Sequence, residues 1–382
     1  MKKFLFVIFS IFLFCGNAVA FEWGGLFTNE SKLGVVPEFN SDNQTESSFA
    51  QNNGLSLWLS TPISKDNNWN FKAEISYDFE FNSENELKVK NIIDCGLMKI
   101  SGLIPIKSTL IDLAFGRFLI NDKTSSVFST ISDGAFCNVF LPKINIGFYA
   151  GYTGFTNMLV ANGFNDYEVN PNLQLYALQA ASIPVIFNFE LPSLFANQSI
   201  SVQALADFDC TKEKVIGNKF YGTLALDGPI FSKLFYTFQT TFGTESFSNV
   251  MNSTLLEFMC FPLNFFSFNI GVQYASGDEL VFAPFKTVTT NAINPLSDNQ
   301  YTDGLFPSVS LIFFSGPFYS KFDVTAALNL FDSAEMIFKG VYSRLSGSIN
   351  VFSDLQLGLD LNAFVNSNET RFSAAIKASF IF

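Results

Sequence analysis

The side chains that could do chemistry in this chain are charged residues that recur along alternating segments, without gathering into a compact motif. In 70–81, Lys72, Glu74, Asp78 and Glu80 all fall on one side of the alternation. Charges arranged along the wall of a pore set ion selectivity, which is strong only where one sign dominates. Acids and bases are mixed here, so we expect at most a mild cation preference. The candidate pore-lining residues are Lys72, Glu74, Asp78, Glu80, Asp112, Arg117, Glu190, Asp207, Asp227, Lys321, Asp323, Arg344, Asp360, Arg371 and Lys377. The alternative is that many of them pair across neighbouring strands and only hold a wall together.

Conventional catalytic and metal sites are hard to build from this sequence, because its 382 residues include no histidine. That absence removes Ser-His and Cys-His pairs, a histidine general base and histidine-ligated metals. An aspartate-only or Ser-Lys mechanism is not excluded, but no spacing indicates one. The acidic residues in 277–304 lack the spacing of a calcium loop. We therefore expect no enzyme activity, no cofactor and no bound metal.

Four cysteines follow the first 20 residues, and their separations match no CxxC metal or redox motif. An exported chain could form disulfides. Cys260, however, lies on the same apolar side of its segment as Leu256 and Phe258, which favours an isolated thiol. We expect isolated thiols at Cys95, Cys137, Cys210 and Cys260.

The overall composition indicates a β protein associated with lipid. The chain has 22 Lys+Arg against 34 Asp+Glu, and this acidic balance argues against a nucleic-acid partner. Charged residues make up 15%, where about 25% is usual for soluble domains. Apolar residues make up 48%, which argues against disorder, and the chain holds 49 phenylalanines.

Residues 1–20 are predicted to be a secretory signal peptide. Lys2 and Lys3 precede an apolar run, and Ala18-Val19-Ala20 is a small-x-small cleavage site. The run is too short to span a membrane, which needs about 20 residues. A rival interpretation, cleavage before a lipidated Cys15, is disfavoured because the large Phe14 precedes it. Residues 21–382 would then be one domain, since no linker or low-complexity stretch interrupts them.

Period-two alternation runs through that domain. Clear examples are 70–81, 265–275, 318–330, 355–365 and 371–382, in which every charged residue falls on the polar side. A charge facing lipid at the membrane midplane costs about 2–4 kcal/mol, which explains this strictness. One segment departs from the pattern: in 91–103 no phase places Asp94 and Lys99 on the same side, so we expect a β-bulge there or an exit from the lipid zone.

A soluble β-sandwich would show the same alternation, but a single sandwich is expected to end nearer 100–200 residues. We predict an all-β fold, a transmembrane antiparallel up-and-down β-barrel of about 18 strands, with 16–20 allowed. Short proline-containing turns should alternate with longer polar loops, periplasmic and extracellular respectively. The first strand is expected near 31–39, although residues 21–29 could form a strand of their own. The segment 172–191 is expected to be one long strand despite Pro184. Connections are expected at 120–134 and, as the longest loop, at 277–304.

The end of the chain carries a family resemblance. Apolar or aromatic residues occupy every second position up to a terminal phenylalanine, and this resembles the assembly signal of outer-membrane β-barrel proteins of the Gram-negative type. The resemblance implies an outer-membrane location and recognition by the barrel-assembly machinery. The residues that match are Phe372, Ile376, Phe380 and Phe382.

A second similarity concerns Gly116-Arg117, followed by a polar stretch and Asp133-Gly134. This pattern is similar to one in the alginate-export and phosphate-type porins. It implies passive or weakly selective passage. A homotrimer is expected only by analogy with porins.

Three functions fit these observations. The first is a porin-like channel for small hydrophilic solutes, whose other partner is outer-membrane lipid. The second is a transporter of hydrophobic compounds like the fatty-acid channels, with residues 21–53 as a plug. The third is a surface barrel or adhesin that transports nothing. The loop 277–304 either folds into the lumen as a constriction or packs over the barrel mouth.

Overall fold

The computed structural model describes residues 21–37, 45–64, 68–83, 89–158, 164, 176–245, 247, 249–277, 282–289, 304–332, 335–366 and 370–382. Its elements are β-strands, and within the described ranges no helix is long and apolar enough to cross a membrane. The strands are β1 (Glu22–Pro37), β2 (Thr45–Pro62), β3 (Trp69–Asn82), β4 (Val89–Ile106), β5 (Thr109–Asn121), β6 (Ser129–Phe140), β7 (Asn145–Tyr152), β8 (Ser182–Leu191), β9 (Ser199–Asp209), β10 (Lys219–Phe231), β11 (Leu234–Glu245), β12 (Asn249–Leu263), β13 (Phe266–Ala275), β14 (Gly304–Ser315), β15 (Phe318–Asp332), β16 (Glu335–Asn350), β17 (Leu355–Val365) and β18 (Thr370–Ile381).

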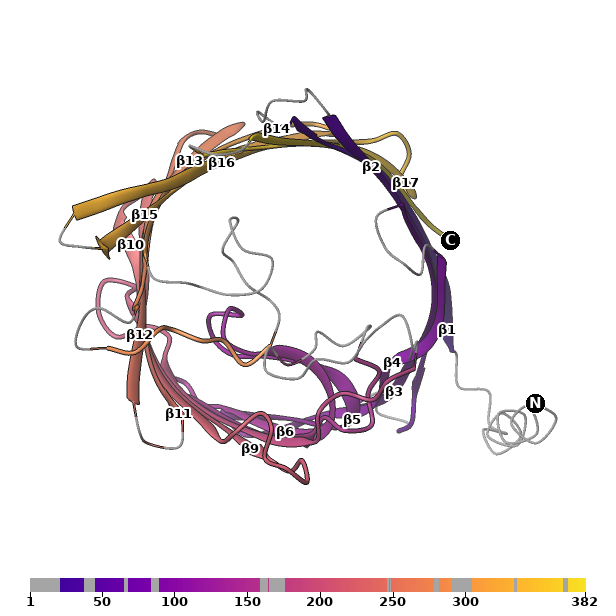
Figure 1. Cartoon of the computed structure of the whole chain (residues 1–382). Helices are drawn as coiled ribbons and strands as arrows, with labels where there is room; N and C mark the ends of the chain where they lie inside the picture. Colours follow the sequence, from indigo (N-terminus) through magenta and orange to yellow (C-terminus); the bar gives the residue numbers. More distant parts are fainter. Residues whose placement is uncertain are drawn as a thin grey trace.

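The strands form one closed antiparallel barrel, in which each strand pairs with its neighbours in the sequence (Figure 1). The barrel closes where β1 pairs with β18, from Leu26 opposite Ile381 to Val35 opposite Phe372. The last residue extends this ladder, because Phe382 N–H donates to the Gly25 carbonyl at 3.0 Å and Gly25 N–H donates back at 2.9 Å. The predicted all-β barrel of 18 strands is confirmed.

Period-two alternation separates the two faces of the wall. In β9, Ser201, Gln203 and Asp207 are buried on the inner face, whereas Val202 and Phe208 are exposed on the outer face. The same rule places the large exposed apolar residues of the other strands outside, where lipid would cover them. The phenylalanine-rich composition therefore follows from a wall with one apolar face.

The irregular segment 91–103 contains the predicted bulge. Glu74 of β3 lies opposite Leu97 of β4, but Ser76 lies opposite Asp94, so β4 carries one extra residue there. This extra residue reverses the alternation and brings both Asp94 and Lys99 to the inner face. Both charged residues therefore avoid lipid, and the β3–β4 hydrogen-bond ladder is irregular at one position.

Three predicted boundaries were wrong, and one of them is the connection expected at 120–134, because β6 already begins at Ser129. β1 runs from Glu22 to Pro37, so residues 22–29 are a strand, as the alternative allowed, but they belong to the same strand as the residues that follow. This strand is part of the barrel wall, so the idea of an N-terminal plug is wrong for it. The strand expected at 172–191 is shorter, since β8 begins at Ser182 and residues 176–181 are not part of it. Pro184 sits within β8. The predicted signal peptide, 1–20, lies outside the described residues.

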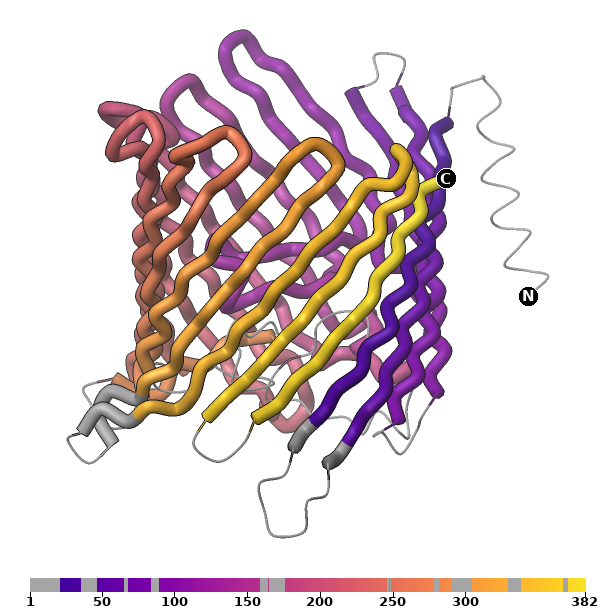
Figure 2. Tube along the Cα trace, turned by 90° about the horizontal axis from the view of Figure 1, so that it is seen from above, coloured from indigo at the N-terminus to yellow at the C-terminus, as the bar shows by residue number. Residues whose placement is uncertain are grey.

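The two ends of the barrel differ. Tight turns join the strands at the end that carries Phe382, which is the upper end in Figure 2. The opposite end, called the loop end here, carries the longer connections, including 153–181 and 276–303. Short turns at one end and long loops at the other match the prediction.

Candidate functional site

The hairpin of β5 and β6 leaves the wall partway along its length. The β4–β5 ladder stops at Met98 opposite Arg117, and the β6–β7 ladder stops at Asp133 opposite Tyr152. Beyond these rungs β5 and β6 still pair with each other, up to Asn121 opposite Ser129. Residues 118–132, called the inner hairpin here, therefore form a two-stranded flap that folds into the interior, seen as the purple tube inside the barrel in Figure 2.

The tip of the inner hairpin contacts the inner wall two to three strands away. Lys123 N–H donates to the side-chain oxygen of Gln203 in β9 at 2.9 Å, and Lys123 Nζ lies 3.9 Å from a carboxylate oxygen of Glu190 in β8. The tip is shaped by Asp122, whose carboxylate accepts the N–H groups of Val127 at 3.1 Å and Phe128 at 2.7 Å. Burial raises the pKa of the Asp122 carboxyl above its usual value, although these donors act in the opposite direction.

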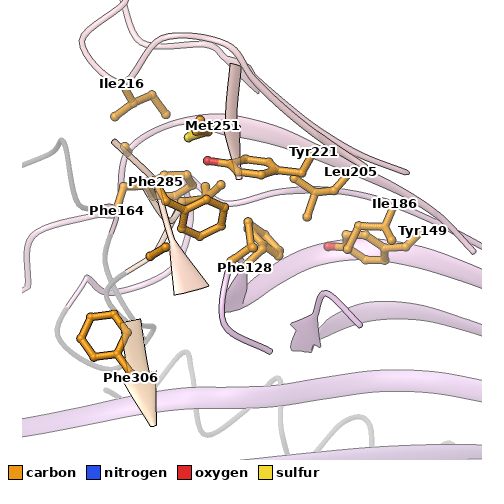
Figure 3. Close-up of a cluster of buried hydrophobic side chains, with 14 of the residues drawn as sticks. Phe128, Tyr149, Phe164, Ile186, Leu205, Ile216, Tyr221, Met251, Phe285 and Phe306 are labelled. Atoms are coloured by element: carbon orange, nitrogen blue, oxygen red, sulfur yellow. The ribbon is translucent and has the colours of Figure 1, made fainter. Parts of the chain in front are cut away.

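Apolar side chains hold the inner hairpin against the wall. Phe128 is fully buried and lies between Phe285 and the wall residue Tyr149 (Figure 3). Phe118 packs edge-on against Tyr149, with ring centroids 5.9 Å apart. The wall contributes apolar residues at inward positions that would otherwise face water, namely Tyr149, Ile186, Leu205, Tyr221 and Met251.

Part of the long loop 277–304 also lies inside the barrel, in agreement with one of the two predicted alternatives. Val288 N–H donates to the Val127 carbonyl at 2.7 Å, and Ser129 N–H donates to the Thr289 hydroxyl at 3.0 Å. Phe285 and Val288 are buried in the same cluster. Residues 278–281 and 290–303 of that loop lie outside the described residues. The described part, 282–289, braces the inner hairpin from the loop end.

The other side of the lumen carries a row of ion pairs, called the charged ladder here, in which Asp323 and Arg344 face each other in the β15–β16 register. Lys321 lies 2.9 Å from Asp323 within β15, and Arg344 of β16 lies 2.8 Å from Asp360 of β17. Lys377 of β18 joins the row across the closure of the barrel, because its Nζ is 2.8 Å from Asp360 and 3.3 Å from Glu30 of β1. Acids and bases alternate across five strands, so the ladder is close to neutral.

A cavity of about 650 Å³ lies along this ladder. All members of the ladder line it, together with hydroxyl and amide side chains such as Thr28, Asn52 and Gln356. The barrel interior is therefore asymmetric: packed side chains fill the part near β5–β12, and a polar cavity follows β15–β18 and β1. A polar solute that crosses the barrel would contact the ladder.

The predicted pore-lining residues fall into several groups. The ladder contains Lys321, Asp323, Arg344, Asp360 and Lys377. Alternation places Lys72, Glu74, Asp78, Glu80, Asp112 and Arg371 on inner positions of β3, β5 and β18. Three acids are held by partners on the packed side: Glu190 by Lys123 and Asn145, Asp207 by Ser182, and Asp227 by Ser199.

Arg117 pairs across neighbouring strands, which the sequence analysis gave as the alternative to a pore-lining role. It lies on the same face of β5 as the exposed Phe115 and Leu119, opposite to the buried Ala114 and Phe118. Its guanidinium makes a two-pronged ion pair with Asp133, at 3.0 and 2.8 Å, and so joins strands instead of lining the cavity. The predicted pattern Gly116-Arg117 and Asp133-Gly134 forms two adjacent rungs of the β5–β6 ladder.

Two residues were missed by the sequence analysis. Glu30 completes the ladder, but the first strand was expected to start after it. Lys219 lies opposite Asp207 in the β9–β10 ladder and is almost fully buried, but it was not among the predicted pore-lining residues. Alternation alone could have found Lys219, because it is in phase with Tyr221 and Thr223.

The cysteines and acids show no metal or disulfide site within the described part of the chain. Cys95, Cys137, Cys210 and Cys260 are free thiols, as expected. No group of three or more Cys, Asp or Glu residues in the described ranges is arranged to hold a metal ion. The inner face carries ion-paired side chains and hydrogen-bonding groups, which a solute inside the barrel could contact.

No family model matches this sequence, and no curated protein matches it. Solved structures match the fold over nearly the whole chain. Pseudomonas aeruginosa OccK5 (OpdH) has a TM-score of 0.61 at 10% identity, covering 94% of this chain and 98% of its own. Pseudomonas aeruginosa OpdQ gives 0.61 at 9%, covering 95% and 97%. Acinetobacter baumannii OccAB4 gives 0.59 at 11%, covering 96% and 99%. The chain thus has the fold of the Occ/Opd outer-membrane porins.

Proposed function

We propose that this chain forms an outer-membrane channel through which small hydrophilic solutes diffuse passively. The observation that carries the proposal is the polar cavity along the charged ladder, inside a closed barrel whose outer face is apolar. A barrel of this strand number is wide enough for an aqueous channel. The likeness to outer-membrane porins supports the same function.

The ladder explains why selectivity should be weak. Each charge in it already has an opposite partner within 3.3 Å, so the wall presents little net field to a passing ion. A mild cation preference would come from acids outside the ladder, such as Glu74 and Asp78 of β3. The predicted pore-lining role of the charged residues is part of this proposal.

Export and assembly complete the proposal. Residues 1–20 would direct export as a cleaved signal peptide, and the chain would fold in the outer membrane. Phe372, Ile376, Phe380 and Phe382 are exposed on the outer side of the last strand, where assembly machinery could read them. A homotrimer remains an analogy with porins.

The transport of hydrophobic compounds is less well supported. The apolar residues of the lumen pack against each other, and Phe128, Phe164 and Phe285 are at most 1% exposed. An apolar solute would therefore meet a filled cluster, while the cavity along the charged ladder is lined by charged and polar side chains.

The test is conductance in planar lipid bilayers. Purified protein should insert as stable conductance steps with a small cation preference in a salt gradient. The absence of steps, together with retained fatty acid or detergent in the purified barrel, would favour the hydrophobic transporter. Migration on gels should depend on heating, because a closed barrel resists denaturation in detergent until it is heated.

A further inference from the structure

The ion pair of Arg117 and Asp133 lies at the place where the inner hairpin leaves the wall. The last rung of β4–β5 involves Arg117, and the last rung of β6–β7 involves Asp133. These two residues also lie opposite each other in the β5–β6 ladder. Within the described residues, positions 118–132 pair with neither β4 nor β7. The two residues therefore mark the hinge between wall and flap.

Arg117 also holds segments on both sides of this hinge. Its Nη1 donates to the Cys95 carbonyl in β4 at 3.5 Å, just beyond the last β4–β5 rung. Its Nη2 donates to the Phe155 carbonyl, after the end of β7, at 3.1 Å. A planar guanidinium with several fixed donors can bridge partners in this way. One side chain thus ties β4, β6 and the segment after β7 at the point where their ladders stop.

The backbone at the hinge is also specialised. Gly116 has φ +125°, and a Cβ there would lie 2.2 Å from the Met98 carbonyl oxygen. Gly134, its partner in the ladder, is equally crowded, because a Cβ would lie 2.5 Å from the Ala150 carbonyl oxygen. The strands can leave the wall at this rung because the two residues that face each other in it, Gly116 and Gly134, have no Cβ atom to collide with the neighbouring backbone.

The ion pair is well suited to hold the hinge in one position. Its side chains are 18% and 29% exposed, so it is partly shielded from solvent, and its two parallel hydrogen bonds fix the angle between guanidinium and carboxylate. Loss of Arg117 would leave the Asp133 carboxylate without its opposite charge and remove the donors to the Cys95 and Phe155 carbonyls. Loss of Asp133 would leave the guanidinium without its carboxylate. The inner hairpin would still be packed by the cluster around Phe128, but its angle to the wall would no longer be fixed at residues 117 and 133.

We propose that Arg117 and Asp133 are positioning residues that hold the inner hairpin inside the barrel, against β8 and β9, and thereby set the width left for the channel. They act through the hairpin, since neither lines the cavity along the ladder. This inference rests on the proposed channel function. It predicts that the ion pair controls conductance although it contacts no solute.

Single-channel recordings of Arg117→Met and Asp133→Asn would test the proposal. Because conductance follows the free cross-section of a pore, we expect an increase of about twofold or flicker between two levels. Lys107→Met is the matched control, since it removes a positive charge from the turn at the other end of the β4–β5 pair and should leave conductance unchanged. The exchange of Arg117 and Asp133 in one double variant should restore steady conductance in part, because the contacts with Cys95 and Phe155 are not rebuilt.

Hydrogen–deuterium exchange of the inner hairpin provides a readout that does not depend on transport. In both single variants, amides in 118–132 should exchange at least about tenfold faster, as expected for a segment that opens locally. Heat-dependent gel migration should remain, which shows that the barrel is intact. Unchanged conductance and unchanged exchange in Asp133→Asn would overturn the proposal, even if Arg117→Met fails to assemble. If the unaltered protein does not conduct but the exchange still increases, the channel function fails while the hinge stands.

Discussion

Lys219 of β10 lies directly opposite Asp207 of β9, and both residues are almost completely buried inside the barrel. Asp207 also accepts a hydrogen bond from the Ser182 hydroxyl at 2.7 Å, which links β8 to the same site. A charge pair is costly to bury, but it is more costly to leave one partner alone. Asp207 therefore links β9 to β8 through the Ser182 hydroxyl, and its carboxylate is attracted electrostatically by Lys219 of β10.

The first prediction concerns this pair. Lys219→Met should lower the free energy of unfolding by about 3–5 kcal/mol, because it leaves the Asp207 carboxylate buried without its opposite charge. Urea unfolding of the barrel in lipid vesicles measures the change. Lys233→Met, at the exposed turn between β10 and β11, should change stability by less than about 0.5 kcal/mol. A similar small effect at Lys219 would show that the pair is not a buried charge pair in the membrane.

The charged ladder gives the second prediction. Asp360→Asn removes the acid that Arg344 and Lys377 share, so two bases face the cavity with one fewer acid. The cation-to-anion permeability ratio should fall by about twofold, because fixed charges along a pore set its ion preference. Lys377→Gln should move the ratio in the opposite direction. Reversal potentials in a salt gradient measure the permeability ratio of each variant. Asp354→Asn, in the turn before β17, is the control. Equal ratios in all variants would show that the ladder does not lie along the path of the ions.

The third prediction concerns the end of the chain. Replacement of Phe382 by Asp should reduce the amount of folded protein in the outer membrane several-fold, since it alters both the proposed assembly signal and the outer face where β18 meets β1. Phe352→Asp is the control, because Phe352 is equally aromatic and exposed but lies in the turn before β17. Membrane fractions and heat-dependent migration give the measurement. Normal membrane levels of the Phe382 variant would contradict the role of this residue in assembly.

The fourth prediction tests the packing of the inner hairpin. Phe128→Ala removes a fully buried ring. The free energy that stabilises the packed inner hairpin should fall by about 3–5 kcal/mol. Amide exchange in 118–132 should accelerate, while the wall strands keep their protection. Phe231→Ala, at an exposed position near the β10 turn, should change neither. Protection of the hairpin that persists in Phe128→Ala would indicate that its polar contacts suffice.

The wall was predictable from the sequence because lipid imposes a strict rule on it. Charged residues cannot face lipid cheaply, so alternation in segments such as 371–382 reveals strand and face together. Even the irregular 91–103 was informative, since only an extra residue could bring Asp94 and Lys99 to one side, and the bulge opposite Glu74 and Ser76 does so.

The interior was less predictable, because it obeys no comparable rule. The inner hairpin was expected to be a polar connection at 120–134, yet it continues two strands and packs both its apolar and polar groups inside. A signal was present: Tyr149, Leu205 and Tyr221 interrupt the polar side of their strands and need an apolar partner. Which segment provides that partner depends on contacts between distant parts of the chain, and local periodicity does not report them.

The pairing of β1 with β18 has a consequence for how the protein is made. Leu26 and Ile381 come from opposite ends of the sequence, so no partial chain can complete the ring. Until they meet, the sheet has two open edges whose N–H and C=O groups can pair with another chain. Contacts this distant in sequence also form slowly, because a long loop must close before they are gained. The β1 and β18 edges therefore stay open to pairing with other chains for the time that the two ends take to meet.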